Sequence, residues 1–289
     1  MFVVAGVTGK SGSVVAEKLL SAGKKVRVLV RDAEKGAPWA AKGAEVAVVK
    51  TLADAAALTQ ALRGAEGAYL LSPPDIQTKD FRAERRPWFD AIAKAIDESG
   101  VAHVVFLSSV GAQHESGTGP IVTLHDAEER LVKTGAKLTF IRAAYFLENF
   151  GAVAAATKAG KLPSFLPAEL RIPVVATRDI GLTAAKALLE GPPANHVDVI
   201  ELAGQRDLTA KEIAEIFAKK VGHEVVVEEH PLDAVVPTFT SFGISAHIGE
   251  LYREMYDGIL NGKVAWETSG GTRLVRGDTD PSSVLGAMV

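Results

Sequence analysis

Three glycines near the start of the chain stand at the spacing that a bound dinucleotide requires. Gly6, Gly9 and Gly12 follow the apolar residues 3–5 and precede a segment, 13–22, whose apolar stripe predicts a helix. Glycine lets the backbone turn sharply beside a pyrophosphate, and a helix N-terminus offers free N–H groups and a partial positive charge. A strand, a glycine turn and a helix in this order predict a dinucleotide site.

Charged residues after the second predicted strand, 25–30, bear on the choice of cofactor. An NAD site carries an acidic residue here for the ribose hydroxyls, and Asp32 could serve if its side chain turned inward. Arg31 and Lys35 favour a 2′-phosphate instead, since a planar guanidinium matches phosphate geometry. An ordinary solvated loop is the alternative for both. The sequence therefore predicts NADP(H), with NAD as the second choice.

The usual proton-handling pair of a short-chain dehydrogenase, Tyr-x-x-x-Lys, is absent from the chain. None of the four tyrosines, Tyr69, Tyr145, Tyr252 and Tyr256, is followed four residues later by lysine. A lysine at that spacing lowers the pKa of the tyrosine so that it can exchange a proton during hydride transfer. Without it the protein must rely on a readily reduced acceptor, which favours a quinone over a simple ketone.

His125 is the first candidate for a proton donor or a group that anchors the nicotinamide. An imidazole titrates near neutral pH and can protonate a reduced oxygen without heavy tuning. The alternative is a structural histidine near the start of a predicted helix, 123–133, bonded to Glu128 or Glu129.

Other candidates also have a structural alternative. Tyr145 could orient a substrate carbonyl or pack at a seam between lobes. Ser108 and Ser109 end a predicted strand at the carboxyl edge, where either catalysis or turn formation explains them. Four aromatic residues could form a wall for a flat substrate, although a plain core is favoured: Phe239, Phe242, Tyr252 and Tyr256.

The remaining histidines do not have metal-ligand spacing. His114, His223 and His230 stand beside glutamates, yet no pair lies at helical i, i+4 spacing with a third ligand in view. We expect isolated surface residues and no metal site.

The order of predicted elements indicates the fold. Strands and helices alternate with short connections up to about residue 150, which predicts an α/β, Rossmann-type, doubly wound parallel sheet. Beyond that residue strands and helices alternate less regularly, which predicts a smaller C-terminal α/β substrate lobe. We expect residues 1–150 to bind NAD(P) and residues 151–289 to bind the substrate, with some mixing between the two parts. The active-site cleft should lie between them. Residues 270–289 are expected to form a surface extension.

Composition excludes several classes of protein. The chain has 289 residues, is 47% hydrophobic, carries a net charge of −3 and contains no cysteine. A negative net charge does not provide the basic surface that nucleic acid requires. The absence of cysteine excludes disulfides and thiolate catalysis. No apolar run reaches the about 18 residues of a membrane span, and the first strand leaves no room for a signal peptide. We expect a cytoplasmic protein, monomer or homodimer.

Several motifs in the first 150 residues resemble the NmrA-like family, an atypical branch of the short-chain dehydrogenases and reductases. They are the segments 6–12, 28–31, 106–109, 125–129 and 139–149, in that order, with the last reading Thr-Phe-Ile-Arg-Ala-Ala-Tyr-Phe-Leu-Glu-Asn. The family includes NADPH-dependent quinone oxidoreductases and non-enzymatic redox-sensing regulators.

The resemblance implies positions for the cofactor and the substrate. It implies pyrophosphate contacts at Thr8, Lys10, Ser11 and Gly12, a 2′-phosphate contact at Arg31, an adenine contact at Asp54, nicotinamide ribose contacts at Ser72 and Pro73, a role for His125, and the mouth of the cleft at Tyr145 and Asn149.

Three functions agree with this sequence. The first is an NADPH-dependent oxidoreductase that reduces a quinone or similar conjugated carbonyl by direct hydride transfer. The second is a non-catalytic sensor that binds NADP and acts through a protein partner. The third is an isomerase or epimerase that uses the bound cofactor transiently.

Overall fold

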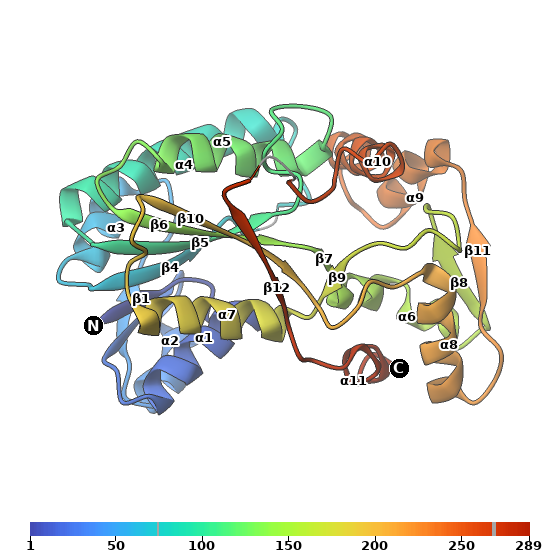
Figure 1. Cartoon of the computed structure of the whole chain (residues 1–289), viewed down its shortest axis with the longest axis horizontal. Helices are drawn as coiled ribbons and strands as arrows, with labels where there is room; N and C mark the ends of the chain where they lie inside the picture. The colour runs from blue at the N-terminus through green and yellow to red at the C-terminus, as the bar shows by residue number, and fades with distance from the viewer. Residues whose placement is uncertain (74, 268–269) are drawn as a thin grey trace.

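One eight-stranded parallel sheet forms the centre of the protein (Figure 1). The computed structural model describes residues 1–73, 75–267 and 270–289. The strands run in the spatial order β12-β10-β6-β5-β4-β1-β2-β3. Their bounds are β1 Phe2–Val4, β2 Val26–Val30, β3 Glu45–Val48, β4 Gly67–Leu71, β5 His103–Ser109, β6 Lys137–Ala143, β10 Val197–Ala203 and β12 Thr272–Arg276. The strand order reverses between β1 and β4, which creates the crevice where doubly wound sheets bind dinucleotides.

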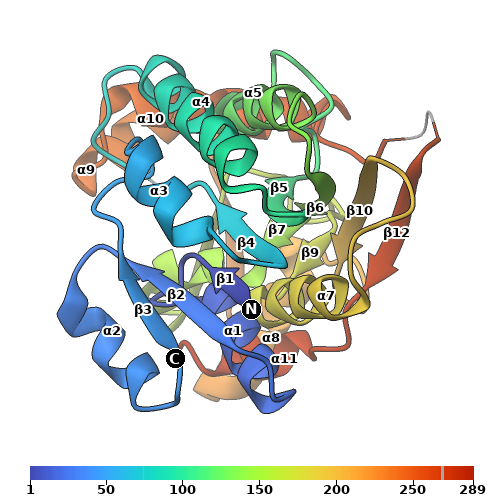
Figure 2. The same ribbon diagram turned by 90° about the vertical axis from the view of Figure 1, so that its left-hand side faces the viewer.

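Helices cover both faces of this sheet (Figure 2). One face carries α1 (Lys10–Ser21), α2 (Ala33–Ala40) and α7 (Thr177–Glu190); the other carries α3 (Ala55–Leu62), α4 (Phe81–Ser99) and α5 (Val122–Leu131). The central strands β1 and β4 are apolar without alternation because both of their faces are buried. The side chains of Val3 and Val4, for example, are both fully buried, but they belong to different hydrophobic clusters on opposite faces. The predicted Rossmann-type fold is confirmed.

The rest of the chain forms a smaller lobe, on the right of Figure 1. It contains two short parallel pairs, β8 (Lys161–Ser164) with β11 (Val226–Glu229) and β7 (Tyr145–Phe146) with β9 (Val174–Val175). Its helices are α6 Ala154–Thr157, α8 Ala210–Val221, α9 Val235–Ser241, α10 Ala246–Leu260 and α11 Pro281–Gly286, and the 3₁₀ turns of the chain are η1 Gly119–Ile121, η2 Leu147–Ala152 and η3 Leu232–Ala234. Thr209 and Glu212 form the predicted capping box of α8.

The chain returns to the large sheet after building part of the lobe. Strand β10 pairs with β6, and β12 pairs with β10, so both extend the sheet. The expectation of a surface extension at the C-terminus is therefore wrong, because residues 272–276 add a strand and Leu285 is fully buried in α11. The boundary at residue 150 stays a prediction, with α7, β10 and β12 on the sheet side.

Proline and short helices account for the other differences. The sequence predicts that Pro87 kinks the helix over 82–99 or makes it start late, and α4 does not start late, because it begins at Phe81 with Asp80 as its cap. The sequence also predicts that Pro237 stops a helical turn over 232–236, but Pro237 lies in the first turn of α9, where its missing N–H is not needed. The sequence did not predict α2 at all. The sequence pattern predicts a helix over 152–159 and a strand over 171–176, but the structure has only the short α6 and the short β9 within these ranges. Among the described residues, no helix is both long and apolar enough to cross a membrane.

Candidate active site

The glycine turn brings the backbone of β1 and α1 into close contact. Gly6 has a φ of +69°, a left-handed conformation that glycine adopts without strain. A Cβ on Gly12 would lie 2.4 Å from the carbonyl oxygen of Gly6 and 2.5 Å from that of Ala5, both backbone atoms that cannot move aside. The turn is closed by a hydrogen bond of 2.9 Å from the backbone N of Gly9 to the Gly6 oxygen. These positions therefore require glycine.

The N-terminus of α1 is left open toward the carboxyl edge of the sheet. No side chain in the described part of the protein caps this helix, and its first turn carries no acidic residue. Free N–H groups and the positive end of the helix dipole fit an anionic group such as a pyrophosphate. Thr8, Gly9 and Lys10 are exposed beside it, as their predicted roles require.

Tyr69 of β4 holds one of the predicted phosphate ligands. Its hydroxyl donates to the Oγ of Ser11 at 3.0 Å, and burial raises the pKa of the phenol, so the proton stays on the tyrosine. The hydrogen of Ser11 is then available for an acceptor in the crevice. Sequence reasoning missed this role, and the signal was a tyrosine in the middle of a buried apolar strand.

The structure of the loop after β2 shows where the side chain of Asp32 points. Its carboxylate caps α2 by accepting from the backbone N of Glu34 at 3.0 Å, so it is engaged away from a ribose. Arg31 in this loop and Lys35 in the first turn of α2 are both exposed, and among the described residues neither side chain has a hydrogen-bond or ion-pair partner. This arrangement fits a 2′-phosphate better than a free ribose hydroxyl.

The remaining predicted cofactor residues lie at the ends of β3, β4 and β5. Asp54 caps α3 by accepting from Ala57 at 3.0 Å, which competes with an adenine contact. Ser72 and Pro73 follow β4, and the buried Oγ of Ser72 has no hydrogen-bond partner among the described residues. Such an orphaned hydroxyl fits a bound polar group. A cofactor contact at each of these residues stays a prediction.

Ser108 belongs to a buried charge network. Its hydroxyl donates to Glu128 at 2.5 Å, and the guanidinium of Arg142 bonds both oxygens of Glu128, at 3.1 and 2.6 Å. Arg142 also pairs with Glu267 at 2.5 Å, and the backbone N of Glu267 donates to Glu201. Burial raises the pKa of Glu201. The network ties α5 and the segment before β12 to the ends of β5 and β6.

His125 does not make the helix contact considered from sequence. Its Nδ1 lies 2.9 Å from the carbonyl oxygen of Ala112, and because a carbonyl only accepts, Nδ1 must carry a hydrogen. Nε2 has no partner among the residues that the structure describes. A fixed Nδ1–H leaves Nε2 as the nitrogen that can take up and release a proton. The alternative, a bond from His125 to Glu128 or Glu129, is therefore not found: His125 bonds Ala112 and Glu128 bonds Arg142.

A large apolar cavity opens between the sheet edge and the smaller lobe. Its volume is about 870 Å³, in the range of small-molecule sites. Tyr145 and Asn149, which follow β6, line one part of it, and the strongly exposed Phe242 lies at its rim with Ile76. All four residues for which a plain core was favoured line this cavity: Phe239, Phe242, Tyr252 and Tyr256. That expectation is wrong, because α9 and α10 pack on each other and leave these aromatic side chains along the cavity wall. His125 is not among the residues that line the cavity.

Three tyrosine hydroxyls gather in this cavity. Burial raises the pKa of Tyr145, and hydrogen bonding with Tyr256 and Asn149 offsets part of the rise. The pKa values of Tyr252 and Tyr256 are also raised by burial. All three phenols therefore stay protonated near neutral pH. The hydrogen bond between Tyr145 and Tyr256 uses the hydrogen of one of these two hydroxyls, which leaves two of the three phenols to donate to a substrate oxygen. Tyr145 also packs against the apolar cluster that contains Ala112, whose carbonyl oxygen bonds His125.

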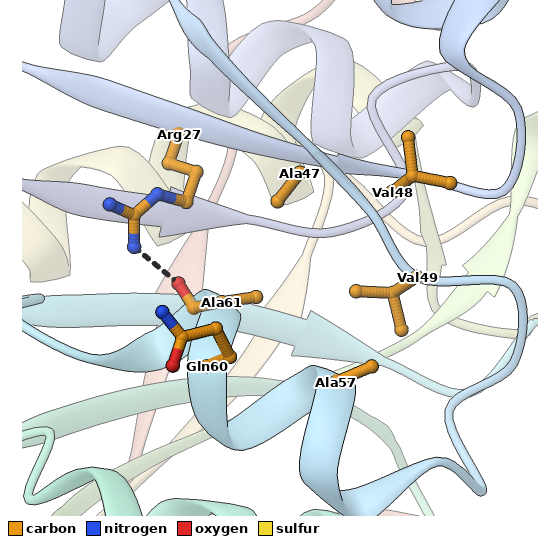
Figure 3. A pocket seen from close by; sticks show the side chains of 7 residues that line it. All are labelled: Arg27, Ala47, Val48, Val49, Ala57, Gln60 and Ala61. Carbon is orange, nitrogen blue, oxygen red and sulfur yellow. Dashed lines mark hydrogen bonds between the residues drawn. The ribbon is translucent and has the colours of Figure 1, made fainter.

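A second, shallower cavity of about 460 Å³ lies between β2, β3 and α3 (Figure 3). Arg27 points into it, but its guanidinium donates to the carbonyl oxygen of Ala61 at 2.7 Å and pairs with Glu45 at 2.9 Å. The charged group is thus used to hold α3 on the sheet. The other lining side chains are small, apolar or amide.

Comparisons with known proteins agree with this geometry. The chain is 25% identical to an NAD(P)H azoreductase of Xenophilus azovorans over 257 residues, which cover 89% of this chain and 86% of that protein. It is 26% identical to quinone oxidoreductase 2 of Escherichia coli, over 79% of this chain and 77% of that one. The crystal structure of an NADPH-dependent quinone oxidoreductase of Escherichia coli complexed with NADPH has a TM-score of 0.83, at 23% identity, and covers 100% of this chain and 99% of that chain. The NmrA-like family model matches residues 1–267, and the chain belongs to this family.

Proposed function

We propose that the protein is an NADPH-dependent oxidoreductase that reduces a quinone or a similar conjugated carbonyl compound. The observation that carries the proposal is the aromatic cavity at the carboxyl edge of the parallel sheet, the same edge that carries the turn suited to a dinucleotide. The azoreductase and quinone oxidoreductase names of the relatives support the same reaction class.

The binding half of the proposal rests on residues that fit the cofactor. The open N-terminus of α1 and Ser11 would hold the pyrophosphate, Arg31 and Lys35 the 2′-phosphate, and the unpartnered hydroxyl of Ser72 the nicotinamide ribose. Bound there, the nicotinamide supplies the hydride.

The chain's own groups then position the acceptor and handle protons. Tyr145 and Asn149 offer donors to a substrate carbonyl, and the apolar wall excludes water from the acceptor ring. His125 is the candidate for the proton that the reduced oxygen needs, because its Nε2 is free and its Nδ1 is fixed by Ala112. Since it does not line the cavity, this role requires a connecting water or a shift of the substrate toward Ala112.

Turnover of NADPH tests the proposal. Purified protein is mixed with NADPH and each member of a panel of quinones, and the fall in nicotinamide absorbance is compared with a protein-free blank. We expect faster oxidation of NADPH with at least one quinone, and about a hundredfold loss of that rate in His125→Ala, the lower end of the usual contribution of a general acid. Unchanged turnover in the variant would remove His125 from the mechanism. Cofactor binding without turnover on any acceptor would instead favour the sensor function.

A further inference from the structure

His230 lies in the wall of the large cavity and is held there by the backbone. It directly follows β11, and its backbone N donates to the carbonyl oxygen of Ser164 at 2.8 Å. Its ring packs against Phe165, with the ring centroids 6.0 Å apart. Both residues line the cavity. The expectation of an isolated surface histidine is therefore wrong for His230, because the pairing of β11 with β8 turns it toward Phe165.

A row of aromatic rings connects His230 with the tyrosines at the sheet edge. Phe165 contacts His230 on one side and Tyr256 on another, at 5.6 Å between centroids. Tyr256 in turn interacts with Tyr145, which follows β6 of the large sheet. Strand β11 lies on the outer side of the smaller lobe, away from the sheet (Figure 1). The imidazole thus belongs to the part of the cavity that is remote from the expected hydride donor.

The charges around His230 favour an uncharged polar ligand. No lysine or arginine is found among the described residues that line the cavity, and the one carboxylate there, Glu148, is occupied by the backbone N and hydroxyl of Thr177. Glu228 lies 4.0 Å from Nε2 of His230 but is paired with Lys161 at 3.0 Å. The wall therefore lacks a fixed positive charge for an anionic substituent, while an imidazole can both donate and accept a hydrogen bond.

We propose that His230 forms a second polar subsite, which binds a hydroxyl or carbonyl substituent on the far ring of a fused, uncharged aromatic acceptor. The subsite rests on the proposed function, in which Tyr145 and Asn149 receive the reacting carbonyl at the sheet edge. The aromatic row between the two polar ends stacks on the fused rings. The acceptor is thereby oriented by two polar contacts separated by an apolar span.

Two matched substrates test the subsite. One is a naphthoquinone with a hydroxymethyl group on its benzo ring, and the other carries an ethyl group, of similar size, at the same position. We expect KM for the hydroxymethyl compound to be about tenfold lower than for the ethyl compound, the upper range of one neutral hydrogen bond. In His230→Phe, which keeps the ring against Phe165, the ratio falls to about one. His223→Phe is the matched control, because His223 is exposed outside the cavity and bonds only a backbone carbonyl.

Binding measurements separate this inference from the proposed function. If neither compound is reduced, the dissociation constants of both are measured by calorimetry on the protein loaded with NADP. The same tenfold preference, lost in His230→Phe and kept in His223→Phe, would support the subsite although the proposed function had failed. Equal affinity of the wild type for both compounds, or an unchanged preference in His230→Phe, would overturn the subsite.

Discussion

The two sides of the candidate active site are built in different ways. On the sheet side, the turn at residues 6–12 and the helix that follows it expose backbone groups, and this single segment of the chain supplies most of the surface that we propose for the phosphates. On the lobe side, the cavity takes its side chains from segments between residues 76 and 256 that are far apart in sequence. A substitution should therefore act sharply on the first side and gradually on the second.

The largest effect that we expect is a loss of stability at low pH, which arises from a histidine in the large sheet. His103 of β5 is fully buried, and burial lowers its pKa from 6.5 to about 4. The unfolded chain then takes up a proton near pH 6.5 while the folded protein does not. The free energy of unfolding should therefore keep its full value above pH 6.5. It should fall by on the order of 3 kcal/mol between pH 6.5 and pH 4.

Denaturant unfolding at pH 7.5 and at pH 4.5 measures this loss. In His103→Gln we expect most of the difference between the two pH values to disappear. A loss of the same size in this variant would show that other groups govern the acid sensitivity of the sheet.

Gly12→Ala tests the backbone construction of the cofactor side. The added Cβ meets two carbonyl oxygens at 2.5 Å or less, so α1 must shift away from β1. We expect NADPH to bind about 100-fold more weakly, equivalent to the 1–3 kcal/mol cost of overpacking. Titration of NADPH fluorescence measures the dissociation constant. Gly135→Ala is the control, because its nearest atom lies 3.9 Å away; a similar loss there, or wild-type affinity in Gly12→Ala, would contradict the close fit.

Arg31→Ser tests the choice between the two cofactors. Loss of charge-assisted hydrogen bonds of about 1.5–3 kcal/mol should raise the ratio of KM for NADPH to KM for NADH by about 10- to 100-fold. We expect a smaller rise in Lys35→Ser, since an ammonium makes fewer directed bonds. Steady-state kinetics with both cofactors give the ratio, and an unchanged ratio in Arg31→Ser would mean that the loop after β2 does not read the 2′-phosphate.

Tyr145→Phe should have the smallest effect, as expected for the cavity side. The phenyl ring keeps its edge-to-face contact with Phe150, at 5.8 Å between centroids, and only the hydroxyl is lost. We expect kcat/KM for a quinone to fall about fivefold, the value of one hydrogen bond of about 1 kcal/mol. An NADPH affinity that fell as strongly as in Gly12→Ala would break the distinction between the two sides.

The same distinction explains how much could be predicted from the sequence. The glycine turn follows from a local pattern. Local patterns also predict a strand over 67–71 and a helix over 246–260, and the structure has β4 and α10 at these residues. The return of β10 and β12 to the large sheet could not be predicted, because strand order depends on contacts between distant segments.

Contacts over long sequence separations also decide the individual residues. The capping role of Asp32 becomes evident only once α2 is known, and His230 becomes a cavity residue only through the pairing of β11 with β8. The bond from His125 to Ala112 likewise joins α5 to the loop after β5. Local periodicity carries no information on such contacts.

Single-turnover oxidation of NADPH tests most directly whether the two sides form one active site. Protein preloaded with NADPH is mixed without oxygen with a naphthoquinone, and nicotinamide absorbance is followed for unlabelled NADPH and for NADPH with deuterium at either face of C4. The account predicts oxidation that depends on the protein and slows when deuterium occupies one of the two faces, since hydride passes directly to the acceptor in the cavity. NADPH that binds tightly yet is oxidised no faster than in the protein-free blank would contradict it.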